Sequence, residues 1–173
     1  MKIALAFCRA VDAINTWVGE TVQWLCLPLV FIVAYEVVAR YVFNRPTLWS
    51  WDISIQIFAF MTAMAASYTL LQKGHVRSDI ITSHLPPRGQ LIVNIVATPL
   101  FLFGIGALAY YFRQEAWWSV AHREVWESLF APPLYPLKVM MFVGFCLLFL
   151  QGLAGFVRDI ISLARPEAGA RSE

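Results

Sequence analysis

Glu36 and Arg40 are the ionisable residues of this chain best placed to act together, and they interrupt a long apolar stretch. Four residues apart on a helix, they lie one turn from each other with the acid on the N-terminal side, which is the order that favours an ion pair. Arg45 and Pro46 follow, and the proline is expected to end the helix because it disfavours a helical residue before it and lacks an N–H. A local ion pair beside a turn is the simplest interpretation. The alternative is that one or both charges reach a neighbouring helix or a partner subunit.

The histidines and cysteines do not have the spacing of a metal, haem or redox site. His75, His84 and His122 all fall in polar connections, whereas a haem held between helices requires histidines inside facing helices. The three cysteines have no metal-ligand spacing and are expected to be small packing residues. No Ser/His/Asp arrangement, glycine-rich phosphate loop or His/Glu metal pattern is recognisable. We therefore expect no catalytic, cofactor-binding or metal-binding residue and no enzymatic activity.

The composition indicates an integral membrane protein. Of its 173 residues 60% are hydrophobic and 14% are charged, against about 45–50% and about 25% in soluble domains. A helix needs about 20 residues to cross roughly 30 Å of hydrocarbon, and four apolar segments approach or exceed that length. The sequence therefore predicts a single all-α membrane domain with four transmembrane helices, at residues 21–43, 52–72, 89–112 and 137–157. The net charge of +2 is too small to suggest nucleic-acid binding.

Residues 1–20 are expected to form an amphipathic helix that lies in the membrane interface before the first span. Its apolar residues recur at helical spacing: Ile3, Phe7, Val11, Ile14 and Val18. Asp12 and Asn15 fall on other faces of this helix. A membrane anchor is the simpler role, and a docking surface for a partner is the alternative.

The distribution of basic residues predicts the orientation. If both termini are cytoplasmic, eight of the 13 Lys and Arg residues face the cytoplasm and five face the other side. This is the bias of the positive-inside rule, so we expect an N-in, C-in topology with residues 158–173 as a cytoplasmic tail. Residues 44–50 and 113–136 then face outward, and residues 73–88 face inward.

Two sequence motifs resemble those of a known family. The first is E-x-x-x-R-Y-x-x-N-x-P-x-x-W, formed by Glu36, Arg40, Tyr41, Asn44, Pro46 and Trp49. The second is G-H-V-x-x-D after the second span, formed by Gly74, His75, Val76 and Asp79. Their order and spacing on a four-span chain resemble the small, DctQ-type membrane subunit of tripartite ATP-independent periplasmic (TRAP) transporters. Residues 132–138 and the pair Gln151 and Gly152 resemble members of that family too, so the likeness covers about residues 20–160.

The resemblance implies a three-part importer in the bacterial inner membrane. In this family a soluble periplasmic protein captures an organic acid, and a large multi-span subunit carries the substrate with sodium ions. The small multi-pass subunit binds the large one among the membrane lipids and has no known catalytic residue. Gly74, His75 and Asp79 would shape a cytoplasmic turn or contact the large subunit.

Two further expectations complete the functional hypothesis. The outward connections would frame the docking of the soluble protein through residues of mixed charge: Arg45, Arg123, Glu124 and Glu127. The alternatives to a transporter scaffold are a self-sufficient small carrier or channel and a membrane anchor for a redox enzyme. The predicted spans provide few buried polar groups for a charged solute, which favours the scaffold.

Overall fold

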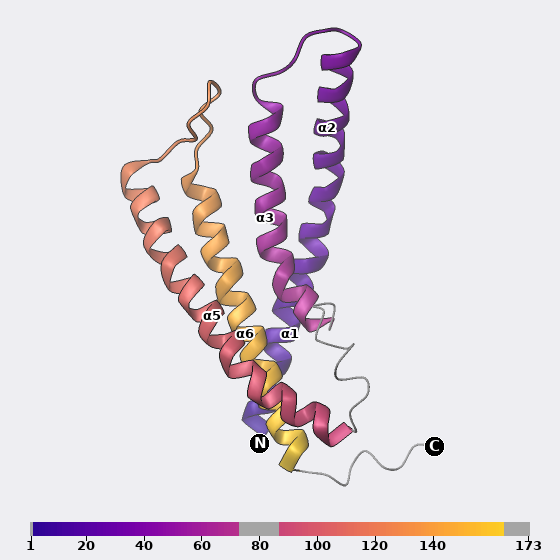
Figure 1. Ribbon diagram of the computed structural model, residues 1–173, viewed down its shortest axis with the longest axis vertical. Helices are drawn as coiled ribbons and strands as arrows, with labels where there is room; N and C mark the ends of the chain where they lie inside the picture. Colours follow the sequence, from indigo (N-terminus) through magenta and orange to yellow (C-terminus); the bar gives the residue numbers. More distant parts are fainter. Residues whose placement is uncertain (1, 73–86, 165–173) are drawn as a thin grey trace.

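The computed structural model describes residues 2–72 and 87–164, and in these ranges the chain is a bundle of long helices (Figure 1). The elements are α1 (Lys2–Val22), the 3₁₀ turn η1 (Gln23–Leu25), α2 (Cys26–Tyr41), α3 (Ser50–Leu71), α5 (Pro87–His122) and α6 (Tyr135–Ala164). Four stretches are long and apolar enough to cross a membrane: Ala4–Tyr41, Ser50–Leu71, Ile95–His122 and Tyr135–Ile161. The predicted all-α fold with four transmembrane helices is therefore confirmed. The motif residues Gly74, His75 and Asp79 lie outside the described residues, as does most of the predicted cytoplasmic tail.

The helices form a row in the order α5, α6, α3, α2, and α1 packs against α3 and α6 (Figure 1). The end of the row that holds the α2–α3 turn and the α5–α6 connection is called the loop end here. The opposite end, where the chain begins, is called the terminal end. The predicted orientation would place the loop end in the periplasm.

The N-terminal helix and the first span follow each other directly. The predicted boundary after residue 20 falls within the last turn of α1, and η1 joins α1 to α2 with helical backbone angles at Val22 and Leu25. Pro28 accounts for the change of hydrogen bonding, because it has no N–H to give to the carbonyl of Trp24, one α-helical turn earlier. The N–H of Cys26 instead bonds to Gln23 O and Trp24 O.

Two helices extend beyond the predicted spans. α5 continues to His122, so nearly half of the connection predicted at residues 113–136 is helix. α6 continues to Ala164, into the predicted tail. The spans were delimited by charge, but charged residues are good helix formers once a helix leaves the hydrocarbon. The helices therefore end later than the apolar runs do.

Close backbone contact joins α3 to α6 at the centre of the row. A Cβ atom added at Gly144 of α6 would lie 2.6 Å from the carbonyl oxygen of Ala63 in α3 and 2.9 Å from its carbonyl carbon. Small residues permit such an approach, and membrane helices associate largely through it because lipid leaves little hydrophobic force between them. Gly144 thus sets the distance between the two halves of the row.

Candidate functional site

Three clusters of polar side chains connect elements of the described residues, and each is named here by its central residue. The Glu36 cluster contains Glu36, Arg40, Thr47 and Ser50. The Lys138 cluster contains Glu115, Glu124 and Lys138. The Asp12 cluster contains Asp12, Asn15, Gln151 and Arg158.

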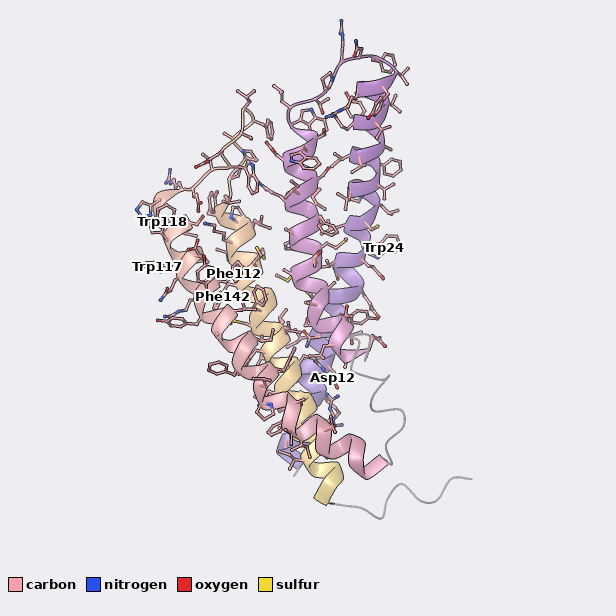
Figure 2. All side chains as sticks on the ribbon, viewed as in Figure 1. Asp12, Trp24, Phe112, Trp117, Trp118 and Phe142 are labelled. Atoms are coloured by element: carbon pink, nitrogen blue, oxygen red, sulfur yellow. The ribbon has the colours of Figure 1, made fainter. Side chains whose placement is uncertain are left out.

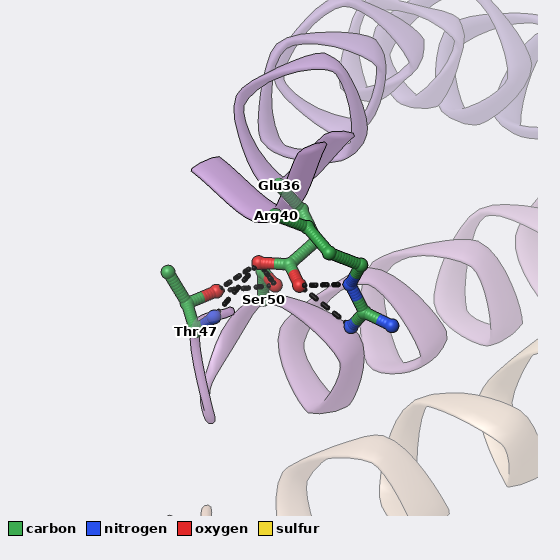
Figure 3. A network of polar contacts seen from close by, with 4 residues as sticks. All are labelled: Glu36, Arg40, Thr47 and Ser50. Carbon is green, nitrogen blue, oxygen red and sulfur yellow. Dashed lines mark hydrogen bonds and ion pairs between the residues drawn. The ribbon is translucent and has the colours of Figure 1, made fainter. Parts of the chain in front are cut away.

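The Glu36 cluster ties α2 to the start of α3 (Figure 3). Arg40 donates to Glu36 Oε1 from Nε at 3.0 Å and from a terminal nitrogen at 2.7 Å. The other carboxylate oxygen accepts from the backbone N–H of Thr47 at 3.1 Å, from the Thr47 hydroxyl and from Ser50 Oγ at 2.8 Å. The structure therefore brings the predicted pair together and adds Thr47 and Ser50, which the spacing argument did not find.

Glu36 is the centre of this cluster, and Arg40 lies at its edge. The Glu36 side chain is 14% exposed and both of its oxygens are occupied, whereas the Arg40 side chain is 52% exposed. Figure 3 shows the third guanidinium nitrogen of Arg40 turned away from the carboxylate. The arrangement stabilises a turn between α2 and α3.

The remaining residues of the first motif form the turn itself. Asn44 has a φ of 52°, in the left-handed region that asparagine enters more readily than most residues. The N–H of Arg45 bonds to Ala39 O at 2.9 Å and closes the end of α2. Trp49 stacks on Tyr35 with 6.0 Å between ring centroids. The motif therefore describes a helix end, a turn and a helix start, with Tyr41 exposed beside them.

The Lys138 cluster ties the start of α6 to α5 and to the connection between them. Lys138 Nζ lies 3.0 Å from Glu115 Oε2 and 2.6 Å from Glu124 Oε2. It also lies 5.9 Å from the ring centroid of Trp118, within the range of a cation–π contact. The hydrogen bond from Lys138 lowers the pKa of Glu124 below its ordinary value of 4.5.

The lowered pKa of Glu124 predicts a loss of stability in acid. A carboxyl group with a depressed folded-state pKa stabilises the fold fully above its unfolded value, and that contribution disappears as the pH falls through the folded value. Glu124→Gln should therefore be less stable than the wild type at pH 7, and the difference should shrink as the pH falls below 4.5. Thermal unfolding of the detergent-purified proteins across pH 3–7 measures this. A constant difference across that range would contradict the assignment.

The connection between α5 and α6 has one face on the bundle and one face in the open. Among residues 123–129, Glu124 bonds to Lys138, and Ser128 donates to Asp52 at the start of α3. Gln56 of α3 donates to Pro133 O at 3.4 Å. The alternate residues are exposed: Arg123, Val125, Glu127 and Leu129, with Leu129 88% exposed. Residues 124–126 are extended and bond to residues 132–134, from Trp126 N–H to Pro132 O and from Leu134 N–H to Glu124 O, both at 2.9 Å, so side chains alternate there.

The predicted docking residues therefore do not lie on one surface. Arg45, Arg123 and Glu127 are exposed at the loop end. Glu124 is held by Lys138 on the inner face of the connection. The sequence did not reveal that Glu124 points inward while Arg123 and Glu127 point outward. The direction of each side chain depends on which face of the connection packs against the helices.

The Asp12 cluster joins α1 to α6 near the terminal end of the row (Figure 2). Arg158 donates to both carboxylate oxygens of Asp12 at 2.5 and 2.6 Å. Gln151 Nε2 donates to Asp12 Oδ1 at 3.1 Å, and Asn15 Nδ2 donates to Gln151 Oε1 at 2.6 Å. Asn15 is 0% exposed and Gln151 is 3% exposed.

Polar residues within apolar helices were the sequence signal for the Asp12 cluster, and helical periodicity did not reveal it. The apolar stripe of α1 turns partly away from the bundle, with Ile14 51% exposed, whereas Asn15 is buried against α6. In a membrane the apolar face can meet lipid, while polar groups at membrane depth require partners inside the protein. Asn15 and Gln151 are polar residues within long apolar helices, so they were the residues to pair.

Removing Gln151 should loosen α1 from α6. Gln151→Leu leaves the Asn15 amide without its acceptor and Asp12 with one donor fewer, so we expect a loss of about 1–2 kcal/mol in unfolding free energy, as for other hydrogen bonds between membrane helices. Unfolding of the purified chain in mixed micelles measures this. Gln114→Leu, at an exposed position of α5, is the matched control. Equal stabilities of the two variants would show that the cluster contributes nothing.

This chain is similar to known transport proteins. The family model described as "Tripartite ATP-independent periplasmic transporters, DctQ component" matches residues 29–161. The sialic acid TRAP transporter permease protein SiaT of Haemophilus influenzae (strain 86-028NP) is 24% identical over 100 residues, 55% of this chain and 16% of the relative. The sialic acid TRAP transporter small permease protein SiaQ of Vibrio cholerae serotype O1 is 23% identical over 84 residues, 49% of each chain. The aligned stretch thus spans half or less of each relative.

Proposed function

This chain belongs to the DctQ component family of tripartite ATP-independent periplasmic transporters, and on that premise we propose that it is a non-catalytic scaffold that binds the large transport subunit. The family and the four apolar helices make it a multi-pass protein of the bacterial inner membrane. The transporter served would take up an organic acid with sodium, after a periplasmic binding protein has captured the acid.

The use of charge within the chain carries this proposal. In each of the three clusters, acidic and basic side chains bind one another within the chain and connect its elements. Among the described residues, Asp52 at the start of α3 likewise accepts a bond from the α5–α6 connection. A carrier needs polar groups directed toward a solute path near the midplane. Charges used to fix helices favour a rigid scaffold over an independent carrier.

Exposed apolar side chains on α2 leave room for a partner in the membrane. α2 packs against α3 in the row, and the rest of its surface carries large exposed residues: Val30, Phe31, Val33, Val37 and Val38. Lipid, a large subunit or both would cover this surface of α2. No other helix among the described residues covers it.

Co-purification tests the scaffold function. The tagged chain, co-expressed with the large subunit encoded beside it, should retain that subunit in detergent as a defined complex. Isolation of the chain without it would count against the proposal. Uptake by the chain alone in vesicles would favour a self-sufficient carrier, and a visible absorption band would favour a redox anchor.

Charge reversal separates docking from folding at the loop end. Arg123→Glu and Glu127→Arg change exposed side chains, so each should slow uptake several-fold at low salt while the two membrane subunits remain associated. Glu124→Lys should instead reduce the yield of folded chain, because it places a second cation beside Lys138. Uptake rates at low and high salt and the yield of complex measure both effects. If Arg123→Glu and Glu127→Arg both leave the uptake rate unchanged, the periplasmic protein docks on the large subunit instead.

A further inference from the structure

A groove of about 730 Å³ lies between the loop-end parts of α5 and α6. Its lining includes Arg113, Gln114, Trp117 and Trp118 of α5 together with Val139 and Phe142 of α6. Figure 2 shows Trp117, Trp118 and Phe142 near this end of the two helices. The volume lies within the range of roughly 300–1,000 Å³ that is typical of small-molecule sites.

Arg113 is the cation in the lining of the groove. Arg113 lies over the ring of Tyr110, with its guanidinium carbon 5.1 Å from the ring centroid, and it forms no ion pair within residues 2–72 and 87–164. The acid in the lining, Glu115, is paired with Lys138. Arg113 therefore keeps its fork of N–H donors for an anion, and a phosphate accepts two of them in parallel.

The position of the groove relative to the membrane indicates an amphiphile. The apolar run of α5 ends at Phe112, so Arg113 begins the polar part of the helix at the level of the headgroups. Trp117 and Trp118 follow, as is typical of the membrane interface. On α6 the apolar residues Val139 and Phe142 lie on the hydrocarbon side of Lys138. Arg113 and these apolar side chains line the same groove, which suits a molecule with a charged part and an apolar part.

We propose that this groove binds one phospholipid of the leaflet at the loop end, with Arg113 on its phosphate and Val139 and Phe142 against its apolar part. The lipid would fill the space between α5 and α6 where their ends meet the interface. This site does not depend on the scaffold function, because its residues and its occupant are independent of the large subunit.

Photo-crosslinking tests the site on the full chain. The chain is reconstituted into phosphatidylethanolamine vesicles that contain a trace of phosphatidylglycerol with a photoreactive group near the glycerol. Adducts should concentrate in peptides that contain residues 113–120 and 139–142. Arg113→Gln should lower them about tenfold, the factor expected for one charge-assisted hydrogen bond. Arg45→Gln removes another exposed cation of the loop end and should leave them unchanged.

Three results would overturn the proposal. Equal labelling by a photoreactive diacylglycerol, which lacks the phosphate, would show that Arg113 does not select the headgroup. Adducts spread evenly along α5 would show that no site exists. Loss of the large subunit from Arg113→Gln with unchanged lipid adducts would assign the groove to a protein contact.

If Arg113→Gln does not give monodisperse protein, Val139→Trp, which fills the groove, decides the question: its adducts should be lost, and undiminished adducts would refute the site.

Discussion

Glu36→Ala should reduce the yield of folded chain several-fold, and more than Arg40→Ala does. Removing the carboxylate leaves Arg40, the Thr47 N–H and the Ser50 hydroxyl without their shared acceptor at the end of α2. Unpaired donors and a lone charge at this depth are costly. Arg40→Ala removes one half-exposed donor group from a carboxylate that keeps its remaining bonds. Fluorescence-detected size-exclusion chromatography of the membrane fraction measures both yields.

The double variant Glu36→Leu, Arg40→Leu provides the control. It removes both charges together, so it should recover part of the yield lost in Glu36→Ala even though Thr47 and Ser50 still lose an acceptor. A yield for Arg40→Ala below that for Glu36→Ala would make the arginine the centre of the cluster. It would also favour the alternative in which Arg40 reaches a partner subunit.

Gly144→Leu should separate the two halves of the row. The first added carbon would lie 2.6 Å from the Ala63 carbonyl oxygen, a backbone atom that can give way only if α3 and α6 move apart. We expect a loss of about 3 kcal/mol, the upper end of the usual cost of overpacking. Unfolding in mixed micelles measures it.

Gly104→Leu is the matched control for this prediction. A Cβ atom added at Gly104 meets nothing within 4 Å, and leucine is a better helix former than glycine at both positions. Gly104→Leu should therefore be at least as stable as the wild type. A similar loss in both variants would mean that the damage does not come from the α3–α6 contact.

The sequence allowed the spans and the family to be predicted because both depend on local features. Apolar length alone reveals a membrane helix, and the turn motif around Asn44 and Pro46 is contiguous. The partners of Glu36 beyond Arg40 could not be predicted, since Thr47 and Ser50 reach the carboxylate only when α3 folds back on α2.

The sites missed by the sequence analysis depend on contacts between distant residues. The bond from Asn15 to Gln151 joins positions 136 residues apart. The burial of Asn15 shows why helical periodicity is a weak guide to packing in a membrane, where an apolar face can face lipid as well as protein. Glu124 was assigned to docking together with Arg123 and Glu127, but its contact with Lys138 depends on the fold of the whole connection.

The central claim, that this chain is a scaffold for a separate transport subunit, is tested most directly by uptake into reconstituted vesicles. Three kinds of vesicle are prepared, with both membrane subunits, with the large subunit alone and with this chain alone. Each receives a sodium gradient and the loaded periplasmic binding protein. Uptake should require both membrane subunits together and should be absent with this chain alone. Equal uptake by the large subunit without this chain, or any sodium-driven uptake by this chain alone, would contradict the account.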